Sequence, residues 1–184
     1  SWVLYDVANS AFALIVLTTI MPIFFKEYAS QGVESSVSTA NWGFANSFAS
    51  LIVAVLAPIM GTLADFRGMK KRFFIFFLAL GIISTGSLIF VGEGMWFLCL
   101  ALFALGRVGY AGGNIFYDAF LPDVTDKKKM DKVSTAGFAL GYIGSVIPFV
   151  LIMVMIYLGM KSAGATQIPP AFAKVGFFIV ALWW

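Results

Sequence analysis

The sequence predicts an all-α membrane protein, built as a bundle of helices that cross a lipid bilayer. Of its 184 residues, 61% are hydrophobic and 11% are charged, whereas soluble domains have roughly 45–50% apolar and about 25% charged residues. Several apolar stretches reach the length of about 20 residues that a membrane-spanning helix needs. Residues 73–80 are apolar without alternation, which excludes the alternating strands of a membrane β-barrel.

Five stretches are expected to span the bilayer as complete helices. They are Trp2–Phe25, Asn41–Ala64, Phe73–Gly92, Met95–Leu121 and Val133–Gly159. A sixth, residues 171–184, holds about 14 residues, which is too few to span alone. We therefore expect residues 1–184 to be one transmembrane part of a longer protein, with its sixth helix truncated and no separate soluble domain.

The connections between these stretches predict the orientation of the chain in the membrane. Arg67 and residues 70–72 lie in the second connection, and residues 127–129 with Lys132 lie in the fourth. Short loops rich in lysine and arginine remain on the cytoplasmic side. The N-terminal end is therefore predicted to lie inside the cell. Because the basic residues lie in these short loops, we attribute the net positive charge of the chain to membrane orientation. We expect no nucleic-acid partner.

The residue inventory excludes several kinds of chemistry. The chain has no histidine and a single cysteine, Cys99, so it has neither an internal disulfide nor histidine-dependent zinc or triad sites. We predict no catalytic residues, no metal and no cofactor. No glycine-rich phosphate loop ending in Lys-Ser/Thr occurs, so energy for any transport would come from an ion gradient.

Glycines recur at helical spacing in the fourth and fifth stretches. Gly109 and Gly113 are four residues apart, as are Gly137 and Gly141. Small residues at this spacing allow membrane helices to approach closely. Close helix packing is the expected role of most of them.

A glycine- and charge-rich loop follows the second stretch. Gly61, Asp65 and Gly68 frame a turn that leads into the basic residues Arg67 and Lys70. By itself this is typical of a cytoplasmic hairpin, but its position between the second and third helices resembles the signature loop of the major facilitator superfamily of transporters. Phe66 and Met69 depart from that pattern, which usually has basic residues there.

A narrower resemblance covers most of the chain. Residues 2–12 (WVLYDVANSAF), 116–123 (FYDAFLPD) and 137–144 (GFALGYIG) are similar to the vacuole-effluxer-like branch, relatives of the autophagy-related amino-acid effluxers. The resemblance implies twelve helices in two six-helix halves, of which this chain is the N-terminal half. It also implies export of amino acids or similar small solutes, as in the fungal members.

Polar residues inside the predicted helices mark the candidate solute pathway. A charge at the bilayer centre costs on the order of 3 kcal/mol, and Arg107 lies near the middle of its helix, with Tyr110, Asn114 and Tyr117 or Asp118 following on the same face. Arg107, Asn46 and Asp6 each also have a structural alternative to a role in the pathway. Arg107 would form an ion pair or bond helix carbonyls, Asn46 would form interhelical hydrogen bonds, and Asp6 would be an interfacial charge. The remaining candidates are Asn9, Ser10, Ser50 and Tyr142.

These residues predict a secondary active transporter that works by alternating access. Arg107 would bind an anionic group of a small solute, and Asp6 would carry a coupling proton or ion. Asp6 lies too near the inner end to form a permanent pair with Arg107. Asp65, Arg67, Lys70 and Asp118 would form the conformational switch. A membrane scaffold or lipid-handling protein is the alternative, and a membrane enzyme a weaker one. The predicted location is the cytoplasmic membrane, or the vacuolar membrane in a fungal cell.

Overall fold

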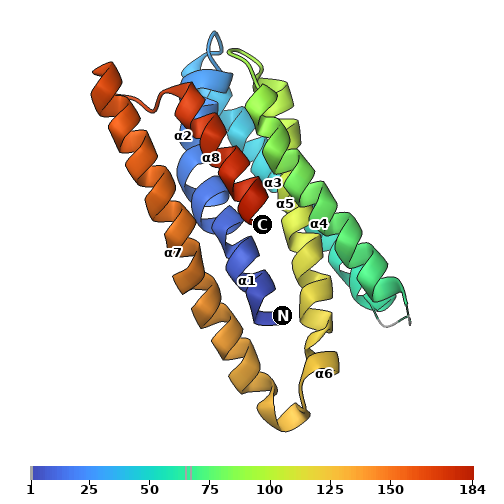
Figure 1. Ribbon diagram of the computed structural model, residues 1–184. Coiled ribbons are helices and arrows are strands. Elements are labelled where there is room, and N and C mark those ends of the chain that lie inside the picture. Colours follow the sequence, from blue (N-terminus) through green and yellow to red (C-terminus); the bar gives the residue numbers. More distant parts are fainter. Residues whose placement is uncertain (1, 65, 67) are drawn as a thin grey trace.

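The computed structural model describes residues 2–64, 66 and 68–184. Within these residues all regular secondary structure is helical, arranged as a bundle of long helices (Figure 1). Five of the helices in the described residues are long and apolar enough to cross a membrane. The predicted all-α membrane fold is confirmed.

The first membrane helix changes its internal hydrogen bonding along its length. It starts as α1 (Trp2–Ala11), widens into the π-helical η1 (Phe12–Ile20), continues as α2 (Met21–Phe24) and ends in the π-helical η2 (Phe25–Ala29). The hydroxyls of Thr18 and Thr19 both donate to the carbonyl oxygen of Leu14. The apolar pattern of this segment predicts a helix but carries no signal for the π-helical turns.

The next three membrane helices alternate in direction. They are α3 (Ser35–Ala64), α4 (Met69–Ser87), which runs on into the 3₁₀ turn η3 (Leu88–Phe90), and α5 (Trp96–Ala119). The second helix starts earlier than the apolar stretch Asn41–Ala64, because the polar residues before it extend the helix beyond the expected hydrocarbon boundary.

The remaining elements are a reversal at one end of the bundle and two further helices. The short α6 (Leu121–Val124) and η4 (Lys127–Lys129) lead into α7 (Met130–Ala163). The chain then turns back as α8 (Pro170–Trp183), which lies beside the first helix (Figure 1). The described residues of both basic connections, 66 with 68–72 and 124–132, lie at the end of the bundle where α1 begins (Figure 1).

Glycines form the closest helix contacts, as their spacing predicts. Helix α5 packs on α4 and α7 packs on α1. At the first contact Gly109 lies directly on the backbone of Gly81. At the second, a methyl group added at Gly137 would lie 2.8 Å from the Trp2 ring. A larger side chain at these positions would separate the helices.

The interior is apolar, and its aromatic residues Phe12, Phe103, Phe116 and Phe177 are almost fully buried. In contrast, α3 and α7 expose large apolar side chains along much of their length, including Phe44, Phe48, Phe138, Tyr142, Leu151 and Tyr157. Such surfaces are stable only against lipid or another apolar surface. Polar side chains inside this bundle are therefore few enough to examine singly.

Candidate functional site

Arg107 reaches from α5 across to α3. Its Nη1 donates to the side-chain oxygen of Asn46 at 2.7 Å and to the Asn46 carbonyl oxygen at 3.3 Å, and its Nη2 donates to Ser50 Oγ at 2.9 Å. Both partners are themselves anchored, since Ser50 donates to the Asn46 carbonyl and the Asn46 amide donates to the Trp42 carbonyl. This network gives the guanidinium one defined position between the two helices.

The positive charge of Arg107 has no counter-charge among the residues that the structure describes. Among the described residues, no carboxylate lies within ion-pair distance of it, and Asp6 and Arg107 are not paired, in agreement with their difference in depth. A guanidinium has more N–H donors than the three bonds use. It lies on an open hollow of about 570 Å³ lined also by Ser47, Leu51 and Ala54. We refer to this hollow as the Arg107 site.

A second polar cavity lies between α1, α5 and α7. Its volume is about 100 Å³, and we refer to it as the acidic cavity. Both of its charged groups, Asp6 and Asp118, are carboxylates, and no described lysine or arginine lines it. The other lining residues are Ser10, Ala13, Tyr110, Asn114, Tyr117, Phe138 and Tyr142.

Close contact between α1 and α7 positions the carboxylate of Asp6. A methyl group added at Gly141 would lie 3.0 Å from both Asp6 Oδ2 and Ser10 Oγ. Asp6 is 6% exposed, yet no hydrogen bond to its side chain occurs in the described part of the chain. Gly141 therefore leaves the space in which this buried carboxylate lies.

The acidic cavity is also held together between α1 and α5. The side-chain nitrogen of Asn9 donates to the side-chain oxygen of Asn114, and Asn9 is almost completely buried. Tyr110 packs against Phe12, with ring centroids 5.3 Å apart. Asn9 thus supports the lining residue Asn114 from behind and does not line the cavity itself.

The structure therefore divides the predicted pathway residues into two groups. Arg107, Asn46 and Ser50 meet at the Arg107 site, while Asp6, Ser10, Tyr110, Asn114 and Tyr142 line the acidic cavity. Sequence reasoning had not assigned Phe138 to the pathway. Its position four residues before Tyr142 on one helix places both on the same face, so helical spacing could have identified it.

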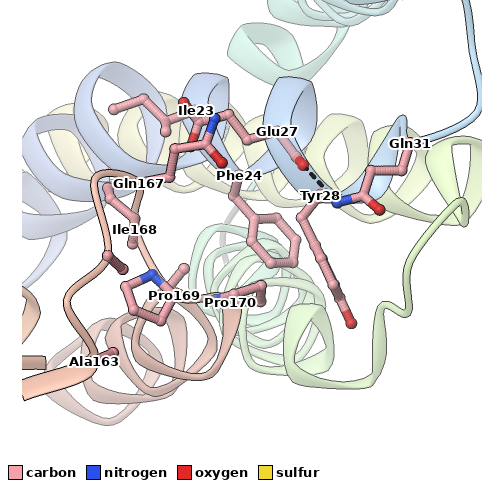
Figure 2. A pocket seen from close by; sticks show the side chains of 12 residues that line it. Ile23, Phe24, Glu27, Tyr28, Gln31, Ala163, Gln167, Ile168, Pro169 and Pro170 are labelled. Carbon is pink, nitrogen blue, oxygen red and sulfur yellow. Dashed lines mark hydrogen bonds between the residues drawn. The ribbon is translucent and has the colours of Figure 1, made fainter. Parts of the chain in front are cut away.

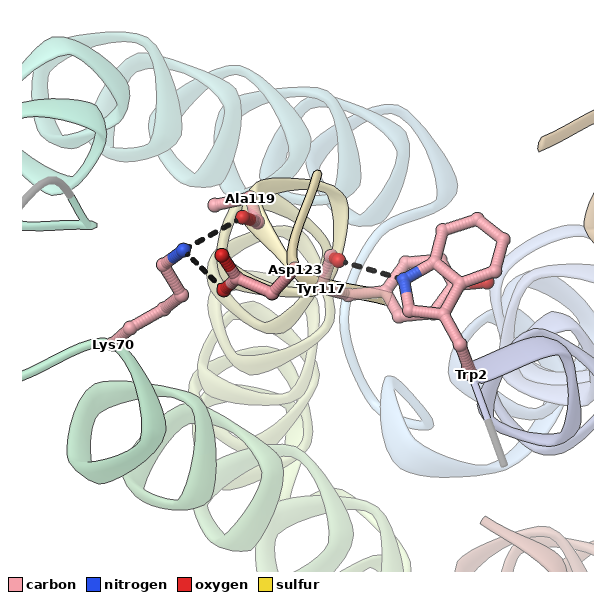
Figure 3. Close-up of polar contacts among 5 residues, drawn as sticks. All are labelled: Trp2, Lys70, Tyr117, Ala119 and Asp123. Atoms are coloured by element: carbon pink, nitrogen blue, oxygen red, sulfur yellow. Dashed lines mark hydrogen bonds and ion pairs between the residues drawn. The ribbon is translucent and has the colours of Figure 1, made fainter. Parts of the chain in front are cut away.

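Lys70 of the basic loop contacts the C-terminal end of α5 and the short α6 (Figure 3). Lys70 Nζ donates to Asp123 Oδ2 at 2.7 Å and to the carbonyl oxygen of Ala119 at 2.8 Å. Gly68 has φ of +84°, in the left-handed region that favours glycine, directly before α4. Gly61 has open space around its α-carbon.

Two of the predicted switch residues, Asp65 and Arg67, lie outside the described residues. The structure pairs Lys70 with Asp123 and places Asp118 in the acidic cavity. Next to it, Trp2 Nε1 donates to the Tyr117 carbonyl at 3.0 Å, and their rings stack with centroids 4.2 Å apart (Figure 3). The start of α1, the start of α4 and the end of α5 are therefore joined through the residues around 117–123.

A third pocket lies at the opposite end of the bundle (Figure 2). It has a volume of about 260 Å³ and lies between the end of the first helix and the connection from α7 to α8. Phe24, Tyr28, Ile168 and the two prolines 169 and 170 give it a mainly apolar lining, with Glu27 and Gln31 among its polar residues. The Gln31 amide is already engaged by the Glu27 carbonyl.

Comparison with known proteins assigns the family. The model of the vacuole effluxer Atg22-like family matches residues 36–130, just over half of the chain. The chain belongs to this family. No solved structure matches it significantly.

Two bacterial relatives match almost the whole chain. An uncharacterized MFS-type transporter of Bacillus subtilis, YxiO, is 44% identical over 185 residues, which cover 100% of this chain and 43% of the relative. An uncharacterized protein of Aquifex aeolicus is 24% identical over 99% of this chain and 42% of its own length. The chain therefore spans less than half the length of these relatives. It is an integral, multi-pass membrane protein of a transporter family.

Proposed function

We propose that the complete protein is a secondary active transporter that moves a small solute across the cytoplasmic membrane by alternating access. Residues 1–184 would form its N-terminal half, and the remaining length seen in the relatives would supply a second half. The solute site would lie between the two, as is usual for transporters built from repeats.

The observation that carries this proposal is that the charge of Arg107 has no carboxylate partner among the described residues. A cation in the middle of a membrane helix is costly, and hydrogen bonds to neutral groups do not remove its charge. In the described residues it has polar support from Asn46 and Ser50 but no carboxylate. A residue that serves packing alone would gain stability from an apolar replacement. A solute with an anionic group would complete the site through the unused N–H donors.

The acidic cavity supports ion coupling. Asp6 is buried and lacks a hydrogen-bond partner among the described residues, so binding a proton or cation there would remove an unfavourable buried charge. Coupling to an ion gradient requires such a group within the pathway. The family resemblance makes amino acids the first candidate solutes, and the basic inner loops favour the orientation with the N-terminal end in the cytoplasm.

The test is solute flux in proteoliposomes that contain the full-length protein. Vesicles loaded with a mixture of amino acids should take up labelled amino acids by exchange, and an imposed proton gradient should drive accumulation. Empty vesicles and vesicles with Asp6→Asn provide the controls, and the mutant should lose gradient-driven accumulation. Lipid scrambling measured in the same vesicles tests the lipid-handling alternative. Protein-dependent scrambling without solute flux would contradict the proposal.

A further inference from the structure

The acidic cavity differs chemically from the Arg107 site. Its charged groups are the carboxylates of Asp6 and Asp118, and its other polar groups are hydroxyls and one amide. None of the described lining residues carries a positive charge. The lining therefore favours a cationic group over an anionic one.

Two buried side chains in this lining lack hydrogen-bond partners. Asp6 is 6% exposed and, within the described chain, no hydrogen bond to its carboxylate occurs. Tyr117 is 4% exposed, and its hydroxyl is buried without a partner in the described structure. Buried polar groups are rarely left unsatisfied, because each costs about 1–3 kcal/mol. The Tyr117 hydroxyl is closed off, whereas the unpartnered Asp6 carboxylate lines the cavity and points to a ligand that donates hydrogen bonds and carries positive charge.

The lining also contains several aromatic rings, whereas a metal ion would need only oxygen ligands. Tyr110, Tyr117, Phe138 and Tyr142 all line it. Aromatic rings around a carboxylate are typical of sites for organic ammonium groups, which are attracted to the faces of the rings. The volume of about 100 Å³ has room for several groups the size of a water molecule.

We propose that the acidic cavity binds the ammonium group of an organic cation, with Asp6 and Asp118 as the charge partners and the surrounding tyrosines and Phe138 as its cage. The inference rests on the proposed function in that the cavity belongs to the solute pathway. Its mouth is open, since Tyr142 on α7 is 69% exposed, whereas Asp6 lies at its buried side. The ammonium group would enter first, and the rest of the molecule would remain toward the mouth.

The cavity and the Arg107 site lie against different neighbours of α5. Arg107 and Asn114 are separated by about 10 Å along the helix at 1.5 Å per residue, and Arg107 is bonded to α3 while Asn114 is bonded to α1. In this conformation a simple α-amino acid is too short to engage both. Ammonium binding in the cavity should therefore not require a carboxylate on the same ligand.

The experiment is a binding measurement on the full-length protein in detergent, independent of flux. Ethylammonium chloride is the probe, with 1-propanol as its neutral analogue and potassium chloride as the salt control. Ethylammonium should raise the unfolding temperature in a saturable manner, and the two controls should not. Glycine is then added as a competitor of ethylammonium. Competition by glycine would show that the ammonium group can come from a zwitterion, and ethylammonium binding that glycine does not affect would show that it comes from an amine.

Variants then locate the binding. Asp6→Asn should weaken ethylammonium binding about tenfold or more. Tyr142→Leu should weaken it several-fold while Tyr142→Phe retains it, and the exposed Tyr142 makes both replacements tolerable for folding. Asp131→Asn, an exposed carboxylate at the start of α7 outside the cavity, is the matched control and should bind normally.

Three results would overturn the inference. They are an equal response to potassium chloride, no saturable response to ethylammonium, or unchanged binding in both Asp6→Asn and Tyr142→Leu. Ethylammonium binding without any solute flux would instead contradict the proposed function and leave the cation site in place. Solute flux without ethylammonium binding would contradict the cation site and leave the proposed function in place.

Discussion

Arg107 on α5 is joined to Asn46 on α3 by two hydrogen bonds, at 2.7 Å to the side-chain oxygen and 3.3 Å to the carbonyl oxygen. Asn46 holds the guanidinium in place without neutralising it. Because Asn46 is uncharged, the positive charge of Arg107 stays available to a ligand.

Asn46→Asp should place a carboxylate directly beside Arg107. The resulting ion pair would compete with an anionic solute, so we expect solute binding to fall at least tenfold while the unfolding temperature is unchanged or higher. Asn41→Asp, one and a half turns earlier on α3, is the matched control and should leave binding within about twofold. Unaltered solute binding in Asn46→Asp would show that Arg107 does not face the solute.

Gly141→Ala should perturb the acidic cavity. The added methyl group would lie 3.0 Å from Asp6 Oδ2 and Ser10 Oγ, so the carboxylate or the helix must shift. We expect a loss of gradient-driven transport of about tenfold with little change in the amount of folded protein. Gly43→Ala on α3, with nothing within 4 Å, should be tolerated and gain up to about 1 kcal/mol of helix stability. Equal transport in the two variants would contradict the role of this contact.

The Lys70–Asp123 pair should affect conformation more than stability. Its side chains are 22% and 57% exposed, and exposed pairs contribute about 0–1 kcal/mol. Lys70→Gln should therefore shift the unfolding temperature slightly, but should change the reactivity of cysteines placed on either side of the solute pathway. The exchanged pair, Lys70→Asp with Asp123→Lys, should restore the parental reactivity in part. A large loss of stability, with unchanged reactivity, would assign the pair to folding alone.

Membrane orientation is tested by cysteine labelling in a Cys99→Ala background. Cys99 is completely buried and is removed only to clear the background. Cysteines at the exposed positions Ser36 and Thr166 should react with an impermeant thiol reagent added outside intact cells, and one at Asp126 should react only after permeabilisation. The reverse pattern would invert the topology.

Much of the fold could be predicted because each membrane helix must satisfy its own backbone hydrogen bonds across the bilayer. A long apolar stretch therefore identifies a helix almost directly, as for α5 and α7. The close glycine contacts were also predictable, since Gly109 and Gly113 on α5, and Gly137 and Gly141 on α7, are each four residues apart. The early start of α3 at Ser35 was not, because its polar residues fit a loop equally well. The π-helical turns of the first helix have no sequence signal.

The sequence predicts most of the polar residues of the candidate site, but it does not predict how they divide between the Arg107 site and the acidic cavity. Arg107 and Asn114 lie on nearly the same face of α5, and helical periodicity therefore placed them in one stripe. That face meets two neighbours, and the long arginine side chain reaches α3 while the shorter asparagine meets α1. Which neighbour each side chain selects depends on the lateral arrangement of the helices, which periodicity does not contain. Asp118 continues this stripe and lines the acidic cavity, whereas its part in the conformational switch stays a prediction.

The most direct test of the account is solute exchange by the full-length protein in proteoliposomes, compared between the parent, Arg107→Lys and Arg72→Lys. A lysine keeps the charge but cannot bond Asn46 and Ser50 while contacting an anionic group in bidentate fashion. We predict that Arg107→Lys loses at least tenfold in exchange of the parent's solute at normal protein level. Arg72→Lys, an exposed arginine in the basic loop, should exchange normally. Parental exchange by Arg107→Lys would contradict the claim that this guanidinium binds the solute.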